Sequence, residues 1–458
     1  MGWVSLLNVK LDALGLRSVS VVDEVCKIIG IKLEDIDFND PIIYQNLQNL
    51  QNPHGLFQIE AETNFKVCNK VKPKNLDELS AVLALARPGA LDYVEQYALY
   101  TNTNTTQSIH SFFDDILNKT GGVCLYQEQM MKMAHKIGFT LDEAEILRRI
   151  VGKKKVEEVK VWKEKIANKI KENKLDSEIG DVLWKVLEDS ANYSFNASHS
   201  YSYAALAAAT VYLKFKYPQQ FFLALLKMTR NEPNPIEEIS KIQKEMPDFG
   251  VKLLPPHILK SKMDFSIEGN DIRFGLLSIK GISDKSMEKL AKFKTDKSGK
   301  FHVFEAANEA DLNIGVLCAL IQAGALDGFQ QSRAKVVYEA QFWNLLTEKE
   351  KMYCLELAEQ FNHDLVAVIK ELTSRKNDKG KPLIKESRIE TLKKNTEKYK
   401  AIYNQNKKSE SFANWYYEKT LLGYTYNKTL LDIFQPKKSD LVSIRQVKNA
   451  SVGRQVSF

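Results

Sequence analysis

The densest group of chemistry-bearing side chains lies in the segment TLDEAEILRRIVGKKK, residues 140–155. A threonine followed three residues later by a glutamate forms a capping box, so we expect a helix to begin here. The cations that follow are Arg148, Arg149, Lys153 and Lys154. Arg149 and Lys153 can share one helix face, and two planar guanidinium groups suit a triphosphate or a nucleic-acid backbone. The alternative is an exposed basic helix end that the helix dipole favours.

A second group combines aromatic, amide, hydroxyl and imidazole side chains in the segment YSFNASHSYSYAALA, residues 193–207. Tyrosine and histidine rings can stack on a nucleobase, and the small residues allow close approach of another helix or a ligand. The simpler interpretation is a polar helix start, with Ser198 as the cap and His199 only hydrogen-bonded. The segments HGLFQIEAE, ALARPGAL and CLYQEQMMKMA are similar mixtures that, taken singly, are compatible with core packing.

A third candidate is Asp12, the single acidic residue of the segment NVKLDALGLR. The segment alternates like a short strand that runs into a tight turn, where an enzyme acting on metal-bound phosphates would place a carboxylate. A two-metal site needs at least two carboxylates, so Asp12 cannot form one alone. Asp35 and Asp37 form an Asp-x-Asp pair nearby, but we interpret their polar surroundings, closed by Pro41, as a loop.

Length and composition indicate the general class of protein to which these residues belong. The chain has 458 residues, 44% hydrophobic and 27% charged, so we expect a globular protein of roughly two to four domains. A net charge of +7 fits a polyanionic partner. Five widely spaced cysteines without a CxxC pair argue for a reducing compartment and against a zinc site. We find no secretory signal, and the run YAALAAATVYL indicates a buried helix rather than a membrane span, so a cytoplasmic protein is expected.

The pattern of apolar residues predicts a mainly α fold with small β elements. FSIEGNDIRFGL predicts a β-hairpin that turns on EGND. The segments at 278–290 (SIKGISDKSMEKL) and 317–329 (LCALIQAGALDGF) each predict a helix, a glycine-centred turn and a second helix. The lysine-rich SRKNDKGKPLIKESR predicts a loop between later helices.

The order of these segments along the chain carries a family resemblance. KLDALGLR, GLFQIEAE, LALARPGAL, LYQEQMMKMA, LRRIVGKKK, YSFNASHS and LKFKYPQQFFLALL follow one another, and LLPPHI, IRFGLLSIKGIS and LIQAGALDGF come after them. Together they closely resemble the catalytic α subunit of bacterial DNA polymerase III, in the C family of replicative polymerases. The resemblance covers nearly the whole chain and reaches more loosely into WYYEKTLLGYT.

The resemblance implies a division into parts of a polymerase. It predicts the last strand of a nucleotidyltransferase-type palm, a helical fingers domain and a connecting segment with short strands. A tandem helix-hairpin-helix element for duplex DNA, a helical lysine-rich region and the truncated start of an oligonucleotide-binding region would follow. In this order, the parts are expected at residues 1–20, 21–228, 229–269, 270–335, 336–440 and 441–458.

In the C family, three palm aspartates bind two Mg²⁺ ions, which activate the primer 3′ hydroxyl and stabilise the leaving pyrophosphate. Asp12 matches the third aspartate, because Lys10 and Leu11 precede it as a lysine and a bulky apolar residue do in the family. The first two form an Asp-x-Asp pair upstream, so Asp35 and Asp37, which follow Asp12, do not match them. The resemblance implies that Asp12 is a catalytic and metal-binding residue of a site completed by other carboxylates.

The resemblance also assigns nucleotide- and DNA-binding roles. The incoming triphosphate would be held by Arg148, Arg149, Lys153 and Lys154. The nascent base pair would lie near Ser198, His199 and Tyr203. The same pocket would be supported by Arg87, Gln58 and Glu60. In the helix-hairpin-helix element, backbone N–H groups at a helix start would meet duplex phosphates around Lys280, Gly281, Ser283, Lys285 and Gly324. A plain helical packing module is the alternative for this element.

Three departures from the family pattern bear on the rate and on DNA affinity. Ser194 and Ala197 stand where the family usually has glycine and lysine, which removes a cation near the nucleotide. FQIEA replaces FQLES. Ser283 stands at a turn where a second, more flexible glycine is common.

We therefore expect a subunit or fragment of a C-family DNA-directed DNA polymerase that binds incoming dNTPs and primer–template DNA. It would be active only with a second polypeptide that supplies the PHP domain, the thumb and the rest of the palm, either as one piece of a split polymerase or as a fragment. A sliding clamp is left open as a partner, because no clear Gln-x-x-Leu-x-Phe peptide is present. The alternative is a non-catalytic DNA-binding or scaffolding relative in a replication complex.

Overall fold

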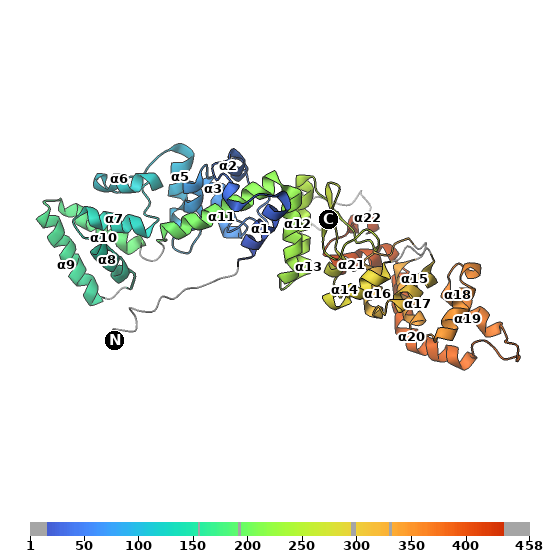
Figure 1. Cartoon of the computed structure of the whole chain (residues 1–458). Helices are drawn as coiled ribbons and strands as arrows, with labels where there is room; N and C mark the ends of the chain where they lie inside the picture. Colours follow the sequence, from blue (N-terminus) through green and yellow to red (C-terminus); the bar gives the residue numbers. More distant parts are fainter. Residues whose placement is uncertain (1–15, 154–155, 191–193, 295–298, 329–331, 435–458) are drawn as a thin grey trace, which may run out of the picture. The chain divides into compact units, whose positions relative to one another are not determined.

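The computed structural model describes residues 16–434 except for residues 154–155, 191–193, 295–298 and 329–331 (Figure 1). Asp12 with the predicted palm strand, and the predicted segment 441–458, therefore lie outside the described residues. Contacts divide the chain into two compact units, Met1–Met228 and Thr229–Phe458. The predicted mainly α fold with small β elements is confirmed, whereas the finer domain boundaries stay predictions.

The described part of the first unit is built from helices. They are α1 (Arg17–Ile29), α2 (Pro41–Leu47), α3 (Glu62–Val71), α4 (Leu76–Leu85), α5 (Val94–Thr103), α6 (Asp114–Leu117), α7 (Gln127–Lys136), α8 (Leu141–Lys153), α9 (Val156–Glu172), α10 (Ser177–Ser190), α11 (Ala197–Lys216) and α12 (Pro218–Met228). Short 3-10 turns, among them η1 (Leu33–Asp35), connect some of them.

The long helix α11 lies at the centre of the first unit, where it packs against α4, α2, α1 and α12. Its alanines at 204 and 207–209 are completely buried, and such small side chains let neighbouring helices approach closely. The buried helix predicted from YAALAAATVYL is thereby confirmed. Within the described residues, we find no helix with the length and apolar character needed to cross a membrane.

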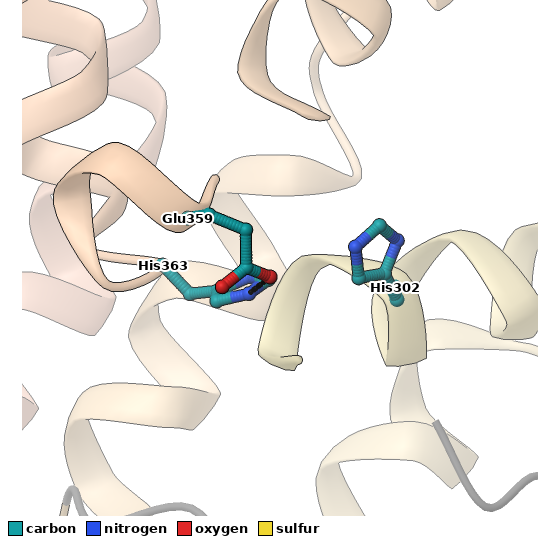
Figure 2. Close-up of side chains that lie close together, drawn as sticks. All are labelled: His302, Glu359 and His363. Atoms are coloured by element: carbon teal, nitrogen blue, oxygen red, sulfur yellow. Dashed lines mark hydrogen bonds and ion pairs between the residues drawn. The ribbon is translucent and has the colours of Figure 1, made fainter. Parts of the chain in front are cut away.

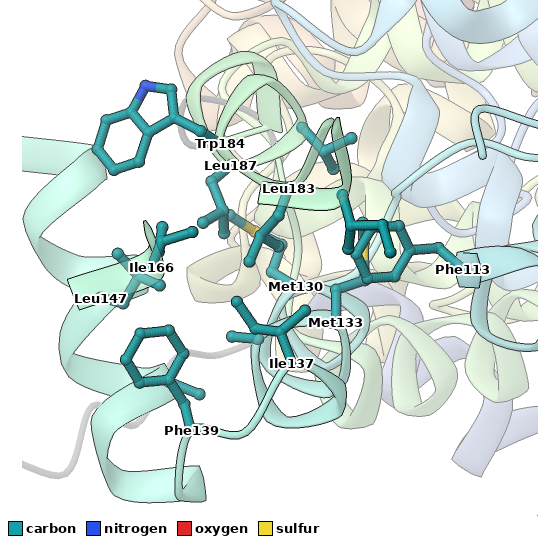
Figure 3. Close-up of a cluster of buried hydrophobic side chains, with 14 of the residues drawn as sticks. Phe113, Met130, Met133, Ile137, Phe139, Leu147, Ile166, Leu183, Trp184 and Leu187 are labelled. Carbon is teal, nitrogen blue, oxygen red and sulfur yellow. The ribbon is translucent and has the colours of Figure 1, made fainter. Parts of the chain in front are cut away.

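A second apolar cluster of this unit lies among the five helices from α6 through α10 and fixes the orientation of α8 (Figure 3). Its members include Phe113, Met130, Met133, Ile137, Phe139, Leu147, Val151, Ile166, Leu183, Trp184 and Leu187. Leu147 and Val151 are four residues apart, so they bury one face of α8 in this cluster. The same packing leaves Arg149 on the exposed side of the helix.

The second unit contains further helices and one small sheet. The helices are α13 (Pro235–Glu245), α14 (Met287–Phe293), α15 (Lys300–Glu309), α16 (Ile314–Gln322), α17 (Arg333–Trp343), α18 (Glu348–Glu356), α19 (Leu365–Ser374), α20 (Glu386–Asn406), α21 (Glu410–Leu422) and α22 (Leu430–Phe434). The strands are β1 (Leu253–Leu254), β2 (Ser266–Glu268) and β3 (Asp271–Arg273), in the order β1-β3-β2.

The hairpin predicted on EGND is confirmed. β2 and β3 pair antiparallel, with Glu268 opposite Asp271, and Gly269 between them has φ +61°. A glycine accepts this left-handed backbone without a steric penalty, which is why the two-residue turn can form here. β1 adds to the other edge of β3 in parallel. The lysine-rich stretch between α19 and α20 is a loop, also as predicted.

The first predicted helix-turn-helix unit differs from expectation in its first half. Only one 3-10 turn, η7 (Leu276–Ser278), precedes the turn at Gly281, and η8 (Asp284–Ser286) with α14 follows it. The preceding residues are held by other contacts: β3 ends at Arg273, and the backbone at Gly275 lies close to that of Asp264. In the second predicted helix-turn-helix, α16 leads into the turn at Gly324, and α17 begins at Arg333.

Candidate nucleotide and nucleic-acid site

Helix α8 begins as its sequence predicts. The Thr140 N–H donates to Glu143 Oε2 at 2.9 Å, and the Glu143 N–H donates to Thr140 Oγ1 at 3.2 Å. This reciprocal pair satisfies backbone donors that have no partner within the helix. The backbone hydrogen bond from Thr140 lowers the pKa of Glu143, so its carboxylate also complements the positive helix start.

Both arginines of α8 are held by one carboxylate, Glu145. Arg148 Nε and Nη2 donate to Glu145 Oε2 and Oε1 at 2.8 and 2.7 Å, and Arg149 Nε donates to Oε1 at 2.7 Å. Hydrogen bonding from Arg148, followed by that from Arg149, lowers the pKa of Glu145 to about 2. Glu145 was not predicted from the sequence, although its i,i+3 and i,i+4 spacing from the two arginines indicates such a pair.

The two arginines differ in exposure. The Arg149 side chain is 65% exposed, whereas that of Arg148 is 22% exposed. The side chain of Lys153 and all of Lys154 lie outside the described residues, so their predicted contribution stays a prediction. The described part of this cluster offers an anion a pair of guanidinium groups whose plane is already fixed.

A row of stacked side chains runs along one side of α11 and joins residues that are far apart in the sequence. The Arg87 guanidinium lies 3.8 Å from the centre of the Phe195 ring. Ring centres are then 5.3 Å apart between Phe195 and His199, 4.1 Å between His199 and Tyr203, and 5.1 Å between Tyr203 and Phe57. We call these five side chains the stacked row, although its ring pairs are T-shaped or tilted rather than parallel. His199 and Arg87 are exposed and Tyr203 is half-buried, so part of the row can meet a flat ligand such as a nucleobase.

The structure thus brings together the predicted residues Arg87, His199 and Tyr203 and adds Phe57 and Phe195. Phe195 lies within the segment quoted for its aromatic content, and the four-residue spacing of His199 and Tyr203 was visible in the sequence. Nothing in the sequence indicated that Arg87 would lie on the Phe195 ring.

The start of α11 is capped by Asn196, so the alternative with Ser198 as the cap is wrong. Asn196 Oδ1 accepts from the His199 N–H at 2.9 Å. Glu128, in the first turn of α7, accepts from the Ala197 N–H at 3.0 Å and from Asn196 Nδ2 at 3.1 Å. A carboxylate at this position complements the positive helix end. Ser198 itself is exposed, and its predicted place near a base pair stays untested.

Hydrogen bonds below this helix start fix the rotation of α11. Ser200 Oγ donates to the Ser80 carbonyl at 2.9 Å and lies 2.9 Å from Ser80 Oγ, which lies 3.0 Å from Tyr126 Oη. All three side chains are buried, and burial raises the pKa of Tyr126 to about 12, so its hydroxyl remains a donor. With Ser200 turned inward, His199 faces outward.

The loop before α3 is tied to the far end of α11. The buried Lys214 Nζ donates to the carbonyls of Asn52 and His54, each at 2.7 Å. Glu60 Oε2 accepts from the Gly55 N–H at 2.8 Å, so this carboxylate closes the loop on itself. Gln58 is exposed with φ +55°, next to the stacked Phe57. Glu60 therefore has a structural task here, and the predicted support of a nucleotide by Glu60 or Gln58 remains a prediction.

The acidic pair Asp35 and Asp37 serves the backbone of its own loop. Asp35 Oδ2 accepts from the Lys32 N–H at 2.8 Å, and Asp37 Oδ1 accepts from the Asn39 N–H at 2.9 Å. These local contacts agree with the loop interpretation.

The two glycine turns of the helix-hairpin-helix element differ in exposure. Around the first turn, Lys280, Gly281, Ser283 and Lys285 are all exposed, and Gly281 has φ +94° with open space beside it. The Lys280 N–H is occupied, since it donates to the Leu421 carbonyl at 3.0 Å. Gly324 is instead buried against Arg333 and Tyr426, which favours a packing role over the predicted DNA contact.

One group of three possible metal ligands occurs among the described residues, His302, Glu359 and His363, with ligand atoms within 4.8 Å of one another (Figure 2). The Phe301 N–H donates to His363 Nδ1 at 3.2 Å, which leaves the proton of a neutral ring on Nε2. His363 Nε2 lies 3.1 Å from Glu359 Oε1 and donates to it, so it offers no lone pair to a metal. This trio is therefore not the predicted Mg²⁺ site, whose ligand Asp12 lies outside the described residues.

Comparison with known proteins gives two family matches, the bacterial DNA polymerase III alpha subunit finger domain over residues 18–174 and the helix-hairpin-helix motif over residues 250–336. The DNA polymerase III subunit alpha of Thermus aquaticus is 31% identical over 347 residues, which are 72% of this chain and 28% of that protein. Those of Halalkalibacterium halodurans and Campylobacter jejuni are 32% and 34% identical, over 70% and 71% of this chain and 29% and 28% of theirs.

These matches cover less than a third of each relative's own length. The two family matches include the segment that holds the arginine pair and the segment that holds the first glycine turn. The chain belongs to the family of bacterial DNA polymerase III alpha subunits and corresponds to the part of them that contains the finger domain and the helix-hairpin-helix motif.

Proposed function

We propose that this chain is the nucleotide- and duplex-binding part of a replicative DNA-directed DNA polymerase. The observation that carries the proposal is the arginine pair of α8, which Glu145 fixes and of which Arg149 is open to solvent, within the segment that matches the finger domain. Charge-assisted hydrogen bonds from such a pair suit the β- and γ-phosphates of an incoming dNTP. The same groups would neutralise the negative charge that develops during phosphoryl transfer.

The stacked row provides the second half of the nucleotide site. The exposed imidazole of His199 would stack against the base or the nascent base pair, and Tyr203 with Phe57 supports it from behind. Arg87, held on the Phe195 ring, adds a cation beside the row. These groups bind and orient, so their contribution is positional rather than chemical.

The first glycine turn would hold the product duplex. Gly281 lets the backbone approach a phosphate closely, and Lys280 and Lys285 add positive charge on either side. Such contacts do not depend on the DNA sequence, as a replicative polymerase requires.

Two Mg²⁺ ions would supply the activation of the primer 3′ hydroxyl and the stabilisation of the pyrophosphate. In this chain Asp12 would hold them, and the remaining carboxylates would come from outside these 458 residues. We assign that contribution to a second polypeptide with the PHP domain, the thumb and the rest of the palm. A sliding clamp stays open as a further partner.

Primer extension tests this proposal directly. The chain combined with a polypeptide that carries the remaining palm should extend a primer, and Asp12→Asn should abolish extension. Asp35→Asn is the matched control, because its carboxylate only accepts a loop N–H, and it should leave extension unchanged. Extension by the chain alone, or full extension with Asp12→Asn, would contradict the proposal.

The alternative is a non-catalytic DNA-binding relative that uses the helix-hairpin-helix element alone. It is favoured by Ala197, which removes a cation at the start of α11 and leaves the carboxylate of Glu128 there. Equilibrium binding separates the two functions. A polymerase part should bind both Mg²⁺-dNTP and duplex DNA, whereas the alternative predicts duplex binding without dNTP binding.

A further inference from the structure

Glu145 is the only residue in the described part of the chain that accepts hydrogen bonds from both Arg148 and Arg149. We propose that Glu145 is a positioning residue, which fixes both guanidinium groups so that their outer edges face a polyphosphate. This inference rests on the proposed function, because it specifies how the arginine pair meets a dNTP.

The pattern of used and unused donors shows where a phosphate would bind. Arg148 presents Nε and Nη2 to the carboxylate, and Arg149 presents Nε. A guanidinium group has five N–H donors arranged as two forks, one at the side and one at the end. Within the described residues, Nη1 of Arg148 and both terminal nitrogens of Arg149 make no hydrogen bond, and Nη2 of Arg148 bonds only Glu145. An anion can therefore bind these edges without displacing Glu145.

Burial decides between a positioning carboxylate and a competing one. Arg148 is 22% exposed and Glu145 is 29% exposed, so their pair is partly withdrawn from water. Losing Glu145 would leave the Arg148 charge partly desolvated and free to change rotamer. A carboxylate that competes with the ligand would instead have to leave the arginines at each binding event. Each time, the partly desolvated Arg148 charge would lose its partner. The geometry therefore favours a carboxylate that stays in place.

A second carboxylate connects the arginine pair to α11. Glu128, which accepts the N–H groups at the start of α11, lies close enough to Arg148 to contribute to raising its pKa, after the larger effect of the Glu145 hydrogen bond. Glu128 thus lies near Arg148 and also binds Asn196 and Ala197, which follow Phe195 of the stacked row in the sequence.

The test compares Glu145→Gln with Glu145→Asp in the full chain. The probes are inorganic tripolyphosphate with Mg²⁺, a non-hydrolysable dNTP analogue with Mg²⁺, and the unphosphorylated deoxynucleoside. Glu145→Gln should raise the Kd of both phosphate-containing probes roughly tenfold, because a misplaced binding group loses affinity steeply. Binding of the deoxynucleoside should not change, and Glu145→Asp should restore part of the lost affinity.

Glu143→Gln is the matched control on the same helix. Glu143 closes the capping box and makes no hydrogen bond to either arginine among the described residues. A glutamine keeps the capping box, so this variant removes one negative charge from the same helix and should leave the Kd of the phosphate probes unchanged. A purely structural role for Glu145 would make the two variants alike in thermal stability and in Kd. Such a result would overturn the inference.

The remaining outcomes separate the inference from the proposed function. Unchanged or tighter binding in Glu145→Gln, together with weaker binding in Arg148→Ala, would overturn only the positioning role. Unchanged binding in both Glu145→Gln and Arg148→Ala would overturn the proposed triphosphate site as well.

Discussion

The two arginine–carboxylate clusters of this protein differ in exposure and in how many of their guanidinium donors are used. On α8, Arg148 and Arg149 share one carboxylate, and Arg149 is 65% exposed. In the second unit, Arg333 is 6% exposed and every part of its guanidinium group is used. It donates to Asp327, to the completely buried Glu418, to Tyr426 and to the Gln322 carbonyl.

The two clusters both contain salt bridges and differ in the number of guanidinium donors that are left without a hydrogen bond among the described residues. Arg333 links the end of α16, the start of α17 and α21, and it covers Gly324. A buried charge with all its donors satisfied holds these elements in one arrangement. Among the described residues, the hydrogen bonds of the α8 pair stay within its own helix, and the remaining guanidinium donors make no hydrogen bond.

The largest expected difference between the clusters is in stability. Glu418→Gln keeps the shape of the side chain but leaves the Arg333 charge without a buried counter-charge, and it should cost about 3–5 kcal/mol of the free energy of unfolding. Glu145→Gln, at the open cluster, should cost less than about 1 kcal/mol. Urea denaturation, with hydrogen exchange of the α17 and α21 amides, measures both. Equal costs would show that burial does not separate the clusters.

The two glycine turns extend the comparison. Gly324 has φ +81° and no space for a Cβ beside Arg333 and Tyr426, so Gly324→Ala should cost about 3 kcal/mol. Gly281 has φ +94° but open surroundings, so Gly281→Ala should cost about 1 kcal/mol. Only Gly281→Ala should weaken duplex DNA binding several-fold, measured by fluorescence anisotropy. A larger loss of DNA binding in Gly324→Ala would reverse the roles given to the two turns.

Removal of the exposed arginine should affect binding far more than folding. Arg149→Ala should raise the Kd of a Mg²⁺-dNTP roughly tenfold, equivalent to about 1.4 kcal/mol. Its effect on the free energy of unfolding should stay below about 0.5 kcal/mol, because exposed ion pairs contribute little. Isothermal titration calorimetry and thermal unfolding measure the two quantities. A drop in stability without a change in Kd would place Arg149 with Arg333 as a structural residue.

The smallest expected effect is that of pH on the stability contribution of Glu145, which should not change near neutral pH. The pKa of Glu145 is lowered from 4.5 to about 2. A carboxyl group with a lowered folded-state pKa stabilises the fold above its unfolded value and loses this contribution as the pH falls through the folded value. The stability difference between the native protein and Glu145→Gln should thus be constant above pH 5 and disappear progressively between about pH 4.5 and 2. A change near pH 6 would contradict this assignment.

Local patterns in the sequence predicted the local structure well. The Thr140–Glu143 capping box and the hairpin at Gly269 formed as expected, because each depends on residues only a few positions apart. Before Gly281 only a 3-10 turn formed instead of the expected helix, in a stretch that follows directly on strand β3. Asp12, Lys153 and Lys154 remain predictions, since the structure does not describe their side chains.

The sequence alone was enough to recognise the family and to single out Arg148 and Arg149 as a pair. Both conclusions rest on the order of motifs and the spacing of residues, which are properties of the linear chain. Only the tertiary structure decided that Arg87 lies on Phe195, that Lys214 ties the loop before α3, and that Arg333 is closed while Arg149 is open. Burial and donor satisfaction depend on neighbours contributed by distant segments. The same residue type is therefore a buried structural tie in one unit and a partly open side chain, proposed to bind phosphate, in the other.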